Sequence, residues 1–193
     1  TRCVNGHYVC DRCHTNGMGE MISVCFQSKS VNPIEIMEKM MCMPSCHMHG
    51  PEHHTMVGSA LLTAYTNAGG NIDLKAALYE MQKRGKQVPG GVCGFWGACG
   101  AGVSTGMYVS IVLKATPLAK EAWGLSNQMT ARALDVIGKN GGPRCCKRDS
   151  YLAIIEAVKF TEDKLGIKMK TDNIVCSRSH LNNQCLQEEC PFH

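Results

Sequence analysis

Hydrophobic and polar residues recur along most of this chain with the 3.6-residue period of an amphipathic helix. The clearest example is the segment 74–85, whose apolar residues share one face and which follows Asp73, a favourable N-cap residue. Residues 103–115 are apolar almost all round, which is typical of a buried helix. The pattern predicts six helices, over 33–43, 51–68, 74–85, 103–115, 119–140 and 151–165.

Residues that start or stop helices stand at the ends of these segments. Asn32 and Pro33 suit the start of the first helix, and Gly69 suits the end of the second. Asp149 or Ser150 is the expected N-cap of the last helix.

Two parts of the chain lack helical periodicity. Residues 1–31 are rich in turns, and within them the segment 21–28 predicts a short strand. Residues 171–193 form a polar, irregular tail that we expect to pack on the core or on the N-terminal knuckle. The expected fold is mainly α: a helical core of about six helices in residues 32–170, with small cysteine-rich metal knuckles at both ends.

The composition is that of a globular protein, since 44% of the 193 residues are apolar and 19% are charged. A net charge of +4 without a basic stripe disfavours a nucleic-acid partner, and we interpret the Lys-Arg pairs at 83–84 and 147–148 as solvated. No apolar run approaches the roughly 20 residues of a membrane span, and no signal peptide is recognisable. We therefore expect a cytoplasmic protein without a membrane partner. A homo-oligomer, or a longer parent protein, stays open.

Cysteine is the most unusual part of the composition. The chain has 13 cysteines, together with 8 histidines and 12 methionines. An odd number of cysteines cannot pair completely, and a chain of this length can bury a core without disulfides. Metal binding or redox chemistry in a reducing compartment is therefore favoured over a disulfide scaffold.

The first cluster of ligand-type residues is the segment CVNGHYVCDRCH. Its C-x-x-C pair brings two thiolates to one tight turn, and the whole cluster has the spacing of a structural zinc knuckle. We predict a zinc site formed by Cys3, His7, Cys10 and Cys13. Cys25 or a tail cysteine could replace His7.

A second cluster surrounds the start of the predicted helix 51–68. A loop that leads into a helix can aim several imidazoles at one point, and the positive helix end favours thiolates. A metal or active site is predicted from Cys42, Cys46, His49, Glu52, His53 and His54. In this prediction Cys46, Glu52, His53 and His54 are catalytic, while Cys42 and His49 bind metal.

Two glycine-flanked cysteine pairs form a third cluster, in the segments 89–102 and 141–150. The sulfurs of an iron–sulfur cluster accept hydrogen bonds from backbone N–H groups, which glycine allows to approach closely. We predict a cluster site formed by Cys93, Cys99, Cys145 and Cys146, with Gly94 and Gly100 beside it.

A structural alternative exists for the same glycines. Ala98, Gly102 and Gly106 recur every four residues, and such a stripe of small residues lets another helix pack closely. The cysteines would then be small buried hydrophobic residues.

The tail carries the fourth cluster. Cys176, Cys185 and Cys190 lie among histidines, and Cys190 precedes a proline, as iron–sulfur ligands sometimes do. The tail could form its own metal module or complete the N-terminal one.

The chain contains, in order, the motifs CVNGHYVCDRCH, CHMHGPEHH, GVCGFWGACGAG, WGLSN and GGPRCCKRDS. Together they resemble an uncharacterised cysteine-rich domain family of anaerobic bacteria and archaea. Its members tend to be fused to, or encoded beside, radical-SAM and methyltransferase-like proteins, so the resemblance implies a partner of that kind. Residues 93–146 are also loosely similar to the C-GCAxxG-C-C redox-associated family, which implies a helical redox or cluster-binding module.

These features support one leading hypothesis and two alternatives. The leading hypothesis is an iron–sulfur protein for redox or sulfur-handling chemistry that acts with a radical-SAM-type enzyme. The first alternative is a zinc-dependent hydrolase or transferase whose metal is bound by His49, His53 and His54 or Cys46, and in which Glu52 moves protons. The second is a binding module whose structural zinc supports docking to a partner protein.

Overall fold

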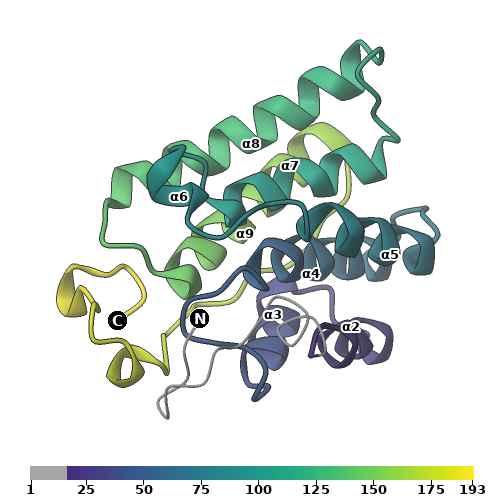
Figure 1. Cartoon of the computed structure of the whole chain (residues 1–193). Helices are drawn as coiled ribbons and strands as arrows, with labels where there is room; N and C mark the ends of the chain where they lie inside the picture. The colour runs from purple at the N-terminus through teal and green to yellow at the C-terminus, as the bar shows by residue number, and fades with distance from the viewer. Residues whose placement is uncertain (1–16) are drawn as a thin grey trace.

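The structure, a computed structural model, describes residues 17–193, and every regular element within them is helical (Figure 1). This confirms the predicted mainly α fold. The residues of the expected N-terminal zinc knuckle, Cys3, His7, Cys10 and Cys13, lie outside the described part. The α-helices are α2 (Met18–Gln27), α3 (Pro33–Met41), α4 (His53–Asn67), α5 (Leu74–Gly85), α6 (Val92–Phe95), α7 (Gly100–Val112), α8 (Glu121–Asn140) and α9 (Cys146–Leu165). Two 3-10 turns follow in the tail, η1 (Ser179–Leu181) and η2 (Gln187–Glu189).

Helix α4 is the central element of the fold. It contacts α2, α3, α5, α7 and α9, and its residues from His53 to Tyr65 are all buried. In Figure 1, α7, α8 and α9 lie on one side of it, and α2 and α3 on the other. The first turn of α4, which carries several predicted site residues, is therefore held inside the protein.

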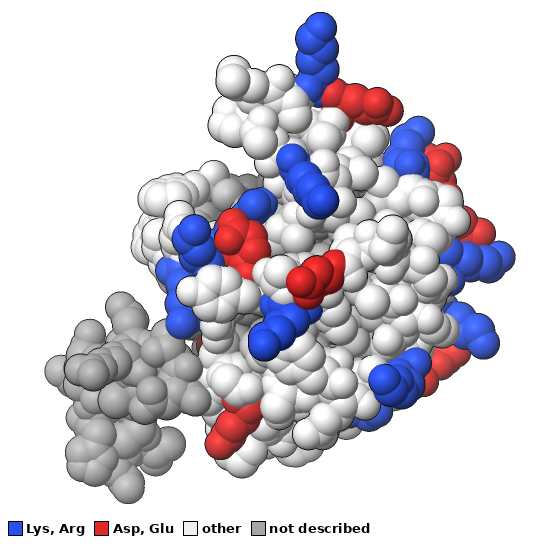
Figure 2. Space-filling model, turned by 90° about the vertical axis from the view of Figure 1, so that its right-hand side faces the viewer, with Lys and Arg blue, Asp and Glu red and all other residues white. Residues whose placement is uncertain are grey.

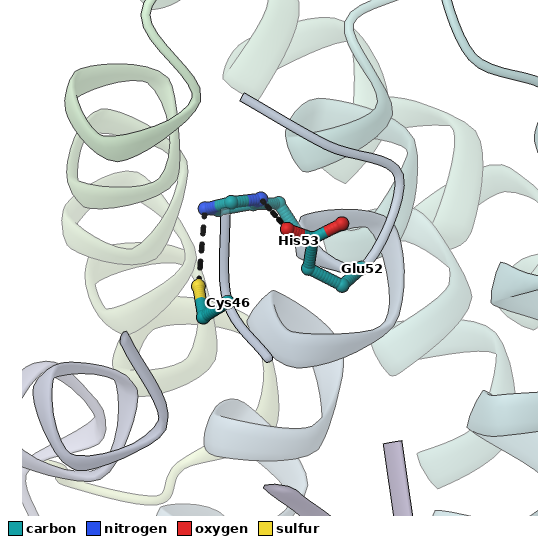
Figure 3. A group of neighbouring side chains, drawn as sticks. All are labelled: Cys46, Glu52 and His53. Atoms are coloured by element: carbon teal, nitrogen blue, oxygen red, sulfur yellow. Dashed lines mark hydrogen bonds and ion pairs between the residues drawn. The ribbon is translucent and has the colours of Figure 1, made fainter. Parts of the chain in front are cut away.

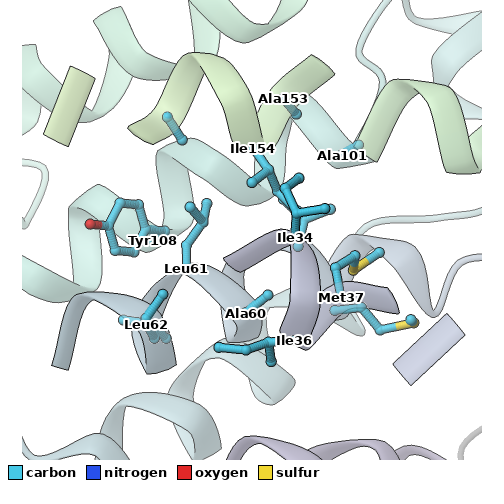
Figure 4. Close-up of a cluster of buried hydrophobic side chains, with 14 of the residues drawn as sticks. Ile34, Ile36, Met37, Ala60, Leu61, Leu62, Ala101, Tyr108, Ala153 and Ile154 are labelled. Atoms are coloured by element: carbon cyan, nitrogen blue, oxygen red, sulfur yellow. The ribbon is translucent and has the colours of Figure 1, made fainter. Parts of the chain in front are cut away.

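The hydrophobic core joins these helices around α4 (Figure 4). Leu61 and Leu62 of α4 are fully buried and lie between the side chains of neighbouring helices, such as Ile154 of α9. Tyr108 of α7 is also fully buried, and its hydroxyl oxygen lies 3.0 Å from Oγ1 of Thr161. This pairing satisfies both hydroxyl groups away from water.

Close packing of α7 on α8 explains two of the glycines. A Cβ atom on Gly106 would lie 2.9 Å from the carbonyl oxygen of Ser126 and would overlap Oγ1 of Thr130. A Cβ atom on Gly102 would lie 2.7 Å from Cδ2 of Leu134. The expected packing role of the small-residue stripe is therefore confirmed at both glycines.

The N-caps expected for two helices are confirmed. Asn32 Oδ1 accepts a hydrogen bond from the backbone N–H of Ile34 at 2.9 Å, and Asp73 Oδ1 accepts one from Ala76 at 3.1 Å. These bonds satisfy N–H groups that have no partner inside the helix.

The predicted strand at 21–28 is wrong, because this segment belongs to α2. Met18, Met21 and Cys25 have helical spacing and are buried against the rest of the core. The tertiary packing of this one face outweighs the strand-like composition of a short apolar run. Together with the short α6, α2 raises the count from the six predicted helices to eight among the described residues.

The predicted start of the last helix is also wrong. Asp149 and Ser150 lie inside the first turns of α9, which begins at Cys146 with Cys145 as the N-cap residue. The longer helix places Lys147 in the first turn, where it is buried.

Charged side chains lie mostly on the surface. On the face shown in Figure 2, basic and acidic side chains stand beside one another. None of the helices in residues 17–193 combines the length and the apolar character required to cross a bilayer.

Candidate metal centre

The N-terminal ends of three helices meet at the candidate site. Gly100, the first residue of α7, lies against the His54 ring of α4, since a Cβ atom on Gly100 would overlap that ring. Lys147 of α9 reaches His53 in the first turn of α4, with 3.0 Å between Nζ and Nε2. Residues distant in the sequence are thus brought around the loop that precedes α4.

Cys46, Glu52 and His53 form a compact group of potential metal ligands (Figure 3). One donor atom from each lies within 4.8 Å of the other two, which holds for no other trio of His, Cys, Asp or Glu in residues 17–193. Cys46 Sγ lies 3.9 Å from Nε2 of His53. Because zinc binds sulfur at about 2.3 Å and imidazole nitrogen at about 2.0–2.1 Å, one ion could contact both atoms.

The neighbours of His53 determine the charge of its ring and which of the two ring nitrogens carries the proton. Nδ1 lies 2.9 Å from the carbonyl oxygen of Gly50, so this nitrogen carries the proton and donates it. Complete burial and the nearby Lys147 charge lower the pKa of His53 well below its ordinary value. The ring is therefore neutral at pH 7, with the lone pair of Nε2 directed at Cys46 and Lys147.

Glu52 lies beside the opposite nitrogen of the same ring. Its Oε1 atom is 3.9 Å from Nδ1 of His53 and accepts a hydrogen bond from the backbone N–H of His47 at 2.8 Å. Its Oε2 atom is buried beside Gly50 and has no hydrogen-bond partner. A carboxylate and a backbone carbonyl behind an imidazole are the partners that orient metal-binding histidines.

Lys147 is the cation already present in this group. Its ammonium donates to the carbonyl oxygen of His47 at 2.8 Å, to His53 Nε2 at 3.0 Å and to Cys46 Sγ at 3.1 Å. Those three bonds use all three ammonium hydrogens, so this ammonium has no unsatisfied donor although the residue is 1% exposed.

The protonation of Cys46 reflects two opposing effects. Burial raises the pKa of its thiol, and the nearby Lys147 charge opposes that increase. Because burial has the larger effect, a metal ion that binds Cys46 near neutral pH must displace a proton.

Acidification is expected to destabilise the protein through its buried histidines. Burial lowers the pKa values of His53 and His54 in the folded state, whereas an unfolded histidine titrates near 6.5. Below pH 6.5 the unfolded chain therefore binds more protons than the folded one. The stability they contribute is complete above pH 6.5 and is lost as the pH falls, by up to about 1.4 kcal/mol per pH unit for each histidine.

Urea unfolding at pH 7.5 and at pH 5.5 measures this effect. His54→Gln should reduce the difference between the two pH values, and His180→Gln, at an exposed position, should leave it unchanged. Equal stability of the wild type at both pH values would contradict the expectation.

Three further residues of the second cluster of the sequence lie around the group formed by Cys46, Glu52 and His53. His54 faces away, with Nδ1 3.1 Å from the carbonyl oxygen of Val88. His49 Nε2 lies 3.2 Å from Oδ1 of Asn182. Cys42 accepts a hydrogen bond from Arg178 Nη2 at 3.2 Å, so it contacts the tail instead of His53.

Among the pockets lined by described residues, the cysteines of the predicted iron–sulfur site are found in two different ones. Cys93 and Cys99 line a cleft of about 510 Å³ together with Gly94, whereas Cys145 lines a pocket with the tail. Cys146 lies near Gly50, whose backbone N–H favours its thiolate, but burial outweighs this and raises the pKa of Cys146 to about 11.

Burial also determines the state of Cys99 and Cys25. Burial and, to a smaller extent, the neighbouring Asp149 carboxylate raise the pKa of Cys99 to about 12. The pKa of Cys25 rises to about 11 because this thiol is enclosed in the core, where it contacts Met40. Both are protonated at pH 7, and Cys25 lies in the core cluster.

Lys147 contacts the candidate metal group, and neither it nor the adjacent Arg148 was predicted to lie at a site. They are 1% and 3% exposed, so the expectation that this Lys-Arg pair is solvated is wrong. The other pair lies on the surface of α5, where Lys83 is well exposed. One feature of the sequence could have indicated that these two residues are buried, because residues 147–148 directly follow two cysteines at the start of a buried helix.

Fold and site together define the class: an all-helical, cysteine-rich protein with a Cys/Glu/His group that could hold a metal ion. The chain belongs to a family of unknown function, DUF5714, which matches residues 21–193. No curated protein and no solved structure matches it. The association with radical-SAM proteins and the C-GCAxxG-C-C similarity stay predictions from the sequence.

Proposed function

We propose that this chain is a zinc-dependent hydrolase or transferase whose metal is bound by Cys46 and His53 and oriented by Glu52. The observation that carries the proposal is the state of His53. This buried, neutral imidazole is held through Nδ1 by a backbone carbonyl, so that Nε2 faces a thiol 3.9 Å away. Sulfur and imidazole ligands suit zinc.

Two protein ligands leave coordination positions for water and substrate. Catalytic zinc sites keep such open positions, whereas structural sites are filled by four protein ligands. Glu52 would then act from behind the ring, by stabilising the His53 tautomer and by moving protons. Its unpaired Oε2 atom has the capacity to accept a proton or a hydrogen bond.

Zinc binding by purified variants tests this proposal. His53→Ala should bind one zinc equivalent less than the wild type, because it removes a ligand. Glu52→Gln should retain the site with about 10–100-fold weaker affinity, which is the usual cost of losing a partner behind a metal ligand. Competitive titration against a chromophoric chelator measures both effects.

His180→Ala provides the matched control, because this histidine is exposed and lies outside the group. It should bind as much zinc as the wild type. The proposal fails if His53→Ala and His180→Ala bind zinc equally well while both remain folded.

A second function is favoured by a different contact, the 3.1 Å between Lys147 Nζ and Cys46 Sγ. An ammonium at this distance stabilises a thiolate, so Cys46 could serve as a nucleophilic or sulfur-carrying thiol without metal. Such a thiol could take part in the redox or sulfur-handling chemistry of the leading sequence hypothesis, which also includes an iron–sulfur cluster and a radical-SAM-type partner. Lys147 would weaken zinc binding at Cys46 but support a thiolate there. A substitution of Lys147 therefore distinguishes the two functions.

A further inference from the structure

Four cysteines from two distant parts of the chain line one small pocket. Cys145 stands at the N-cap of α9, and Cys176, Cys185 and Cys190 belong to the tail. The pocket has a volume of about 20 Å³, and a volume of about 10–15 Å³ already holds one water molecule. We propose that these cysteines form a metal centre, separate from the Cys46 group, that takes a thiophilic metal as a zinc ion or an iron–sulfur cluster.

The backbone around the thiols is arranged as it is around metal-bound thiolates. The N–H group of Arg178 donates to Cys176 Sγ at 3.4 Å, and that of Gln187 donates to Cys185 Sγ at 3.4 Å. In both cases the donor lies two residues after the cysteine. Hydrogen bonds to sulfur favour the thiolate form, which is the form that binds metals.

Positive charge and a side-chain amide complete the surroundings of the pocket. The guanidinium groups of Arg148 and Arg178 belong to residues that line it, and both residues are buried. Asn182 Nδ2 lies 3.8 Å from Cys145 Sγ. Four thiolates bring several negative charges together, and these polar groups lie close to them, although Arg178 and Arg148 are also paired with Glu38 and Asp149.

The tail has little regular structure of its own. In residues 171–193 only Arg178, Asn182 and Phe192 are buried, and the regular structure is limited to two single turns. Arg178 binds Glu38 at 2.7 Å, and the Phe192 ring packs edge-to-face on Tyr151. A metal held by three tail cysteines and by Cys145 would fasten the segment to α9, as structural metals do in small irregular modules.

The distances between the four sulfur atoms affect which metal centre they could bind. In residues 17–193 the trio of ligand atoms within 4.8 Å of one another belongs to the Cys46 group, so no three sulfurs of this pocket lie that close together. A single zinc ion would therefore draw the sulfurs together, whereas a cluster would have to widen the pocket of about 20 Å³. A disulfide is the competing outcome, and all four cysteines are free in this structure.

Anaerobically purified wild-type chain provides the first test. We expect one centre at this pocket, seen either as iron with acid-labile sulfide and visible absorbance, or as zinc. When the metal is zinc, replacement by Co²⁺ should give the intense visible bands of tetrahedral thiolate coordination, and X-ray absorption should show sulfur neighbours. These measurements use the wild-type protein, so they do not require that any variant folds correctly.

Variants then locate the centre. Cys185→Ser and Cys190→Ser should each lose this centre, while Cys93→Ser, a cysteine of the other cleft, should keep it. His53→Ala should also keep it, which separates this proposal from that for the Cys46 group. The proposal is overturned if Cys185→Ser and Cys93→Ser carry the same metal, if the bound metal has no sulfur neighbours, or if thiol titration of the anaerobic protein finds these cysteines in disulfides.

Discussion

Lys147→Met is expected to raise the affinity of the Cys46 group for zinc by about ten- to a hundredfold. In the wild type the ammonium of Lys147 occupies the lone pairs of His53 Nε2 and Cys46 Sγ, at 3.0 and 3.1 Å. It also repels a divalent cation at short range, where unit charges interact by about 4 kcal/mol at an effective dielectric constant of 20. Methionine has a similar length without the charge, so both obstacles are removed.

The same variant distinguishes the two proposed functions. If Cys46 acts as a nucleophile, the loss of the Lys147 charge raises the pKa of its thiol further and slows alkylation by iodoacetamide at pH 8. Tighter zinc binding supports the zinc-dependent function, and slower alkylation with unchanged zinc affinity supports the thiol function. Lys83→Met, on the exposed side of α5, should change neither value.

Gly106→Ala is expected to lower the free energy of unfolding by about 1–3 kcal/mol, the usual cost of overpacking. The new methyl group would overlap Oγ1 of Thr130 and lie 2.9 Å from the Ser126 carbonyl oxygen. The backbone oxygen cannot rotate away, so α7 and α8 must separate. Thermal unfolding should show a decrease of about 2–4 °C for each kcal/mol in a chain of this size.

Gly124→Ala is the matched control for this change. Gly124 lies inside α8, and a Cβ atom there would have no neighbour within 4 Å. Alanine has the higher helix propensity, so this substitution should stabilise the protein by about 0.5–1 kcal/mol. If both substitutions shift the melting temperature in the same direction, the close approach of α7 and α8 is not what requires Gly106.

Local patterns in the sequence predicted the helices well, because helix formation depends on residues three or four apart. The caps at Asn32 and Asp73 are examples, since each side chain bonds a backbone group within three residues. The strand prediction for 21–28 failed for a related reason. A short apolar run does not by itself distinguish a helix from a strand, and the burial of Met18, Met21 and Cys25 on one helical face became visible only in the structure.

The candidate metal centre was partly predictable for the same physical reason. Cys46, Glu52 and His53 lie within eight residues, so a single turn into a helix suffices to gather them. Lys147 reaches this group across a sequence separation of 101 residues, and nothing in the spacing indicates that contact. The gathering of tail cysteines around Cys145 likewise depends on tertiary folding.

Asn182 connects the two sites described above. Its side-chain oxygen lies 3.2 Å from His49, in the loop before α4, and its side-chain nitrogen lies 3.8 Å from Cys145. We expect a metal that fixes the tail to restrict, through these contacts, the loop that carries Cys46, and any resulting change in affinity would be reciprocal between the two sites. Asn182→Ala should weaken this coupling.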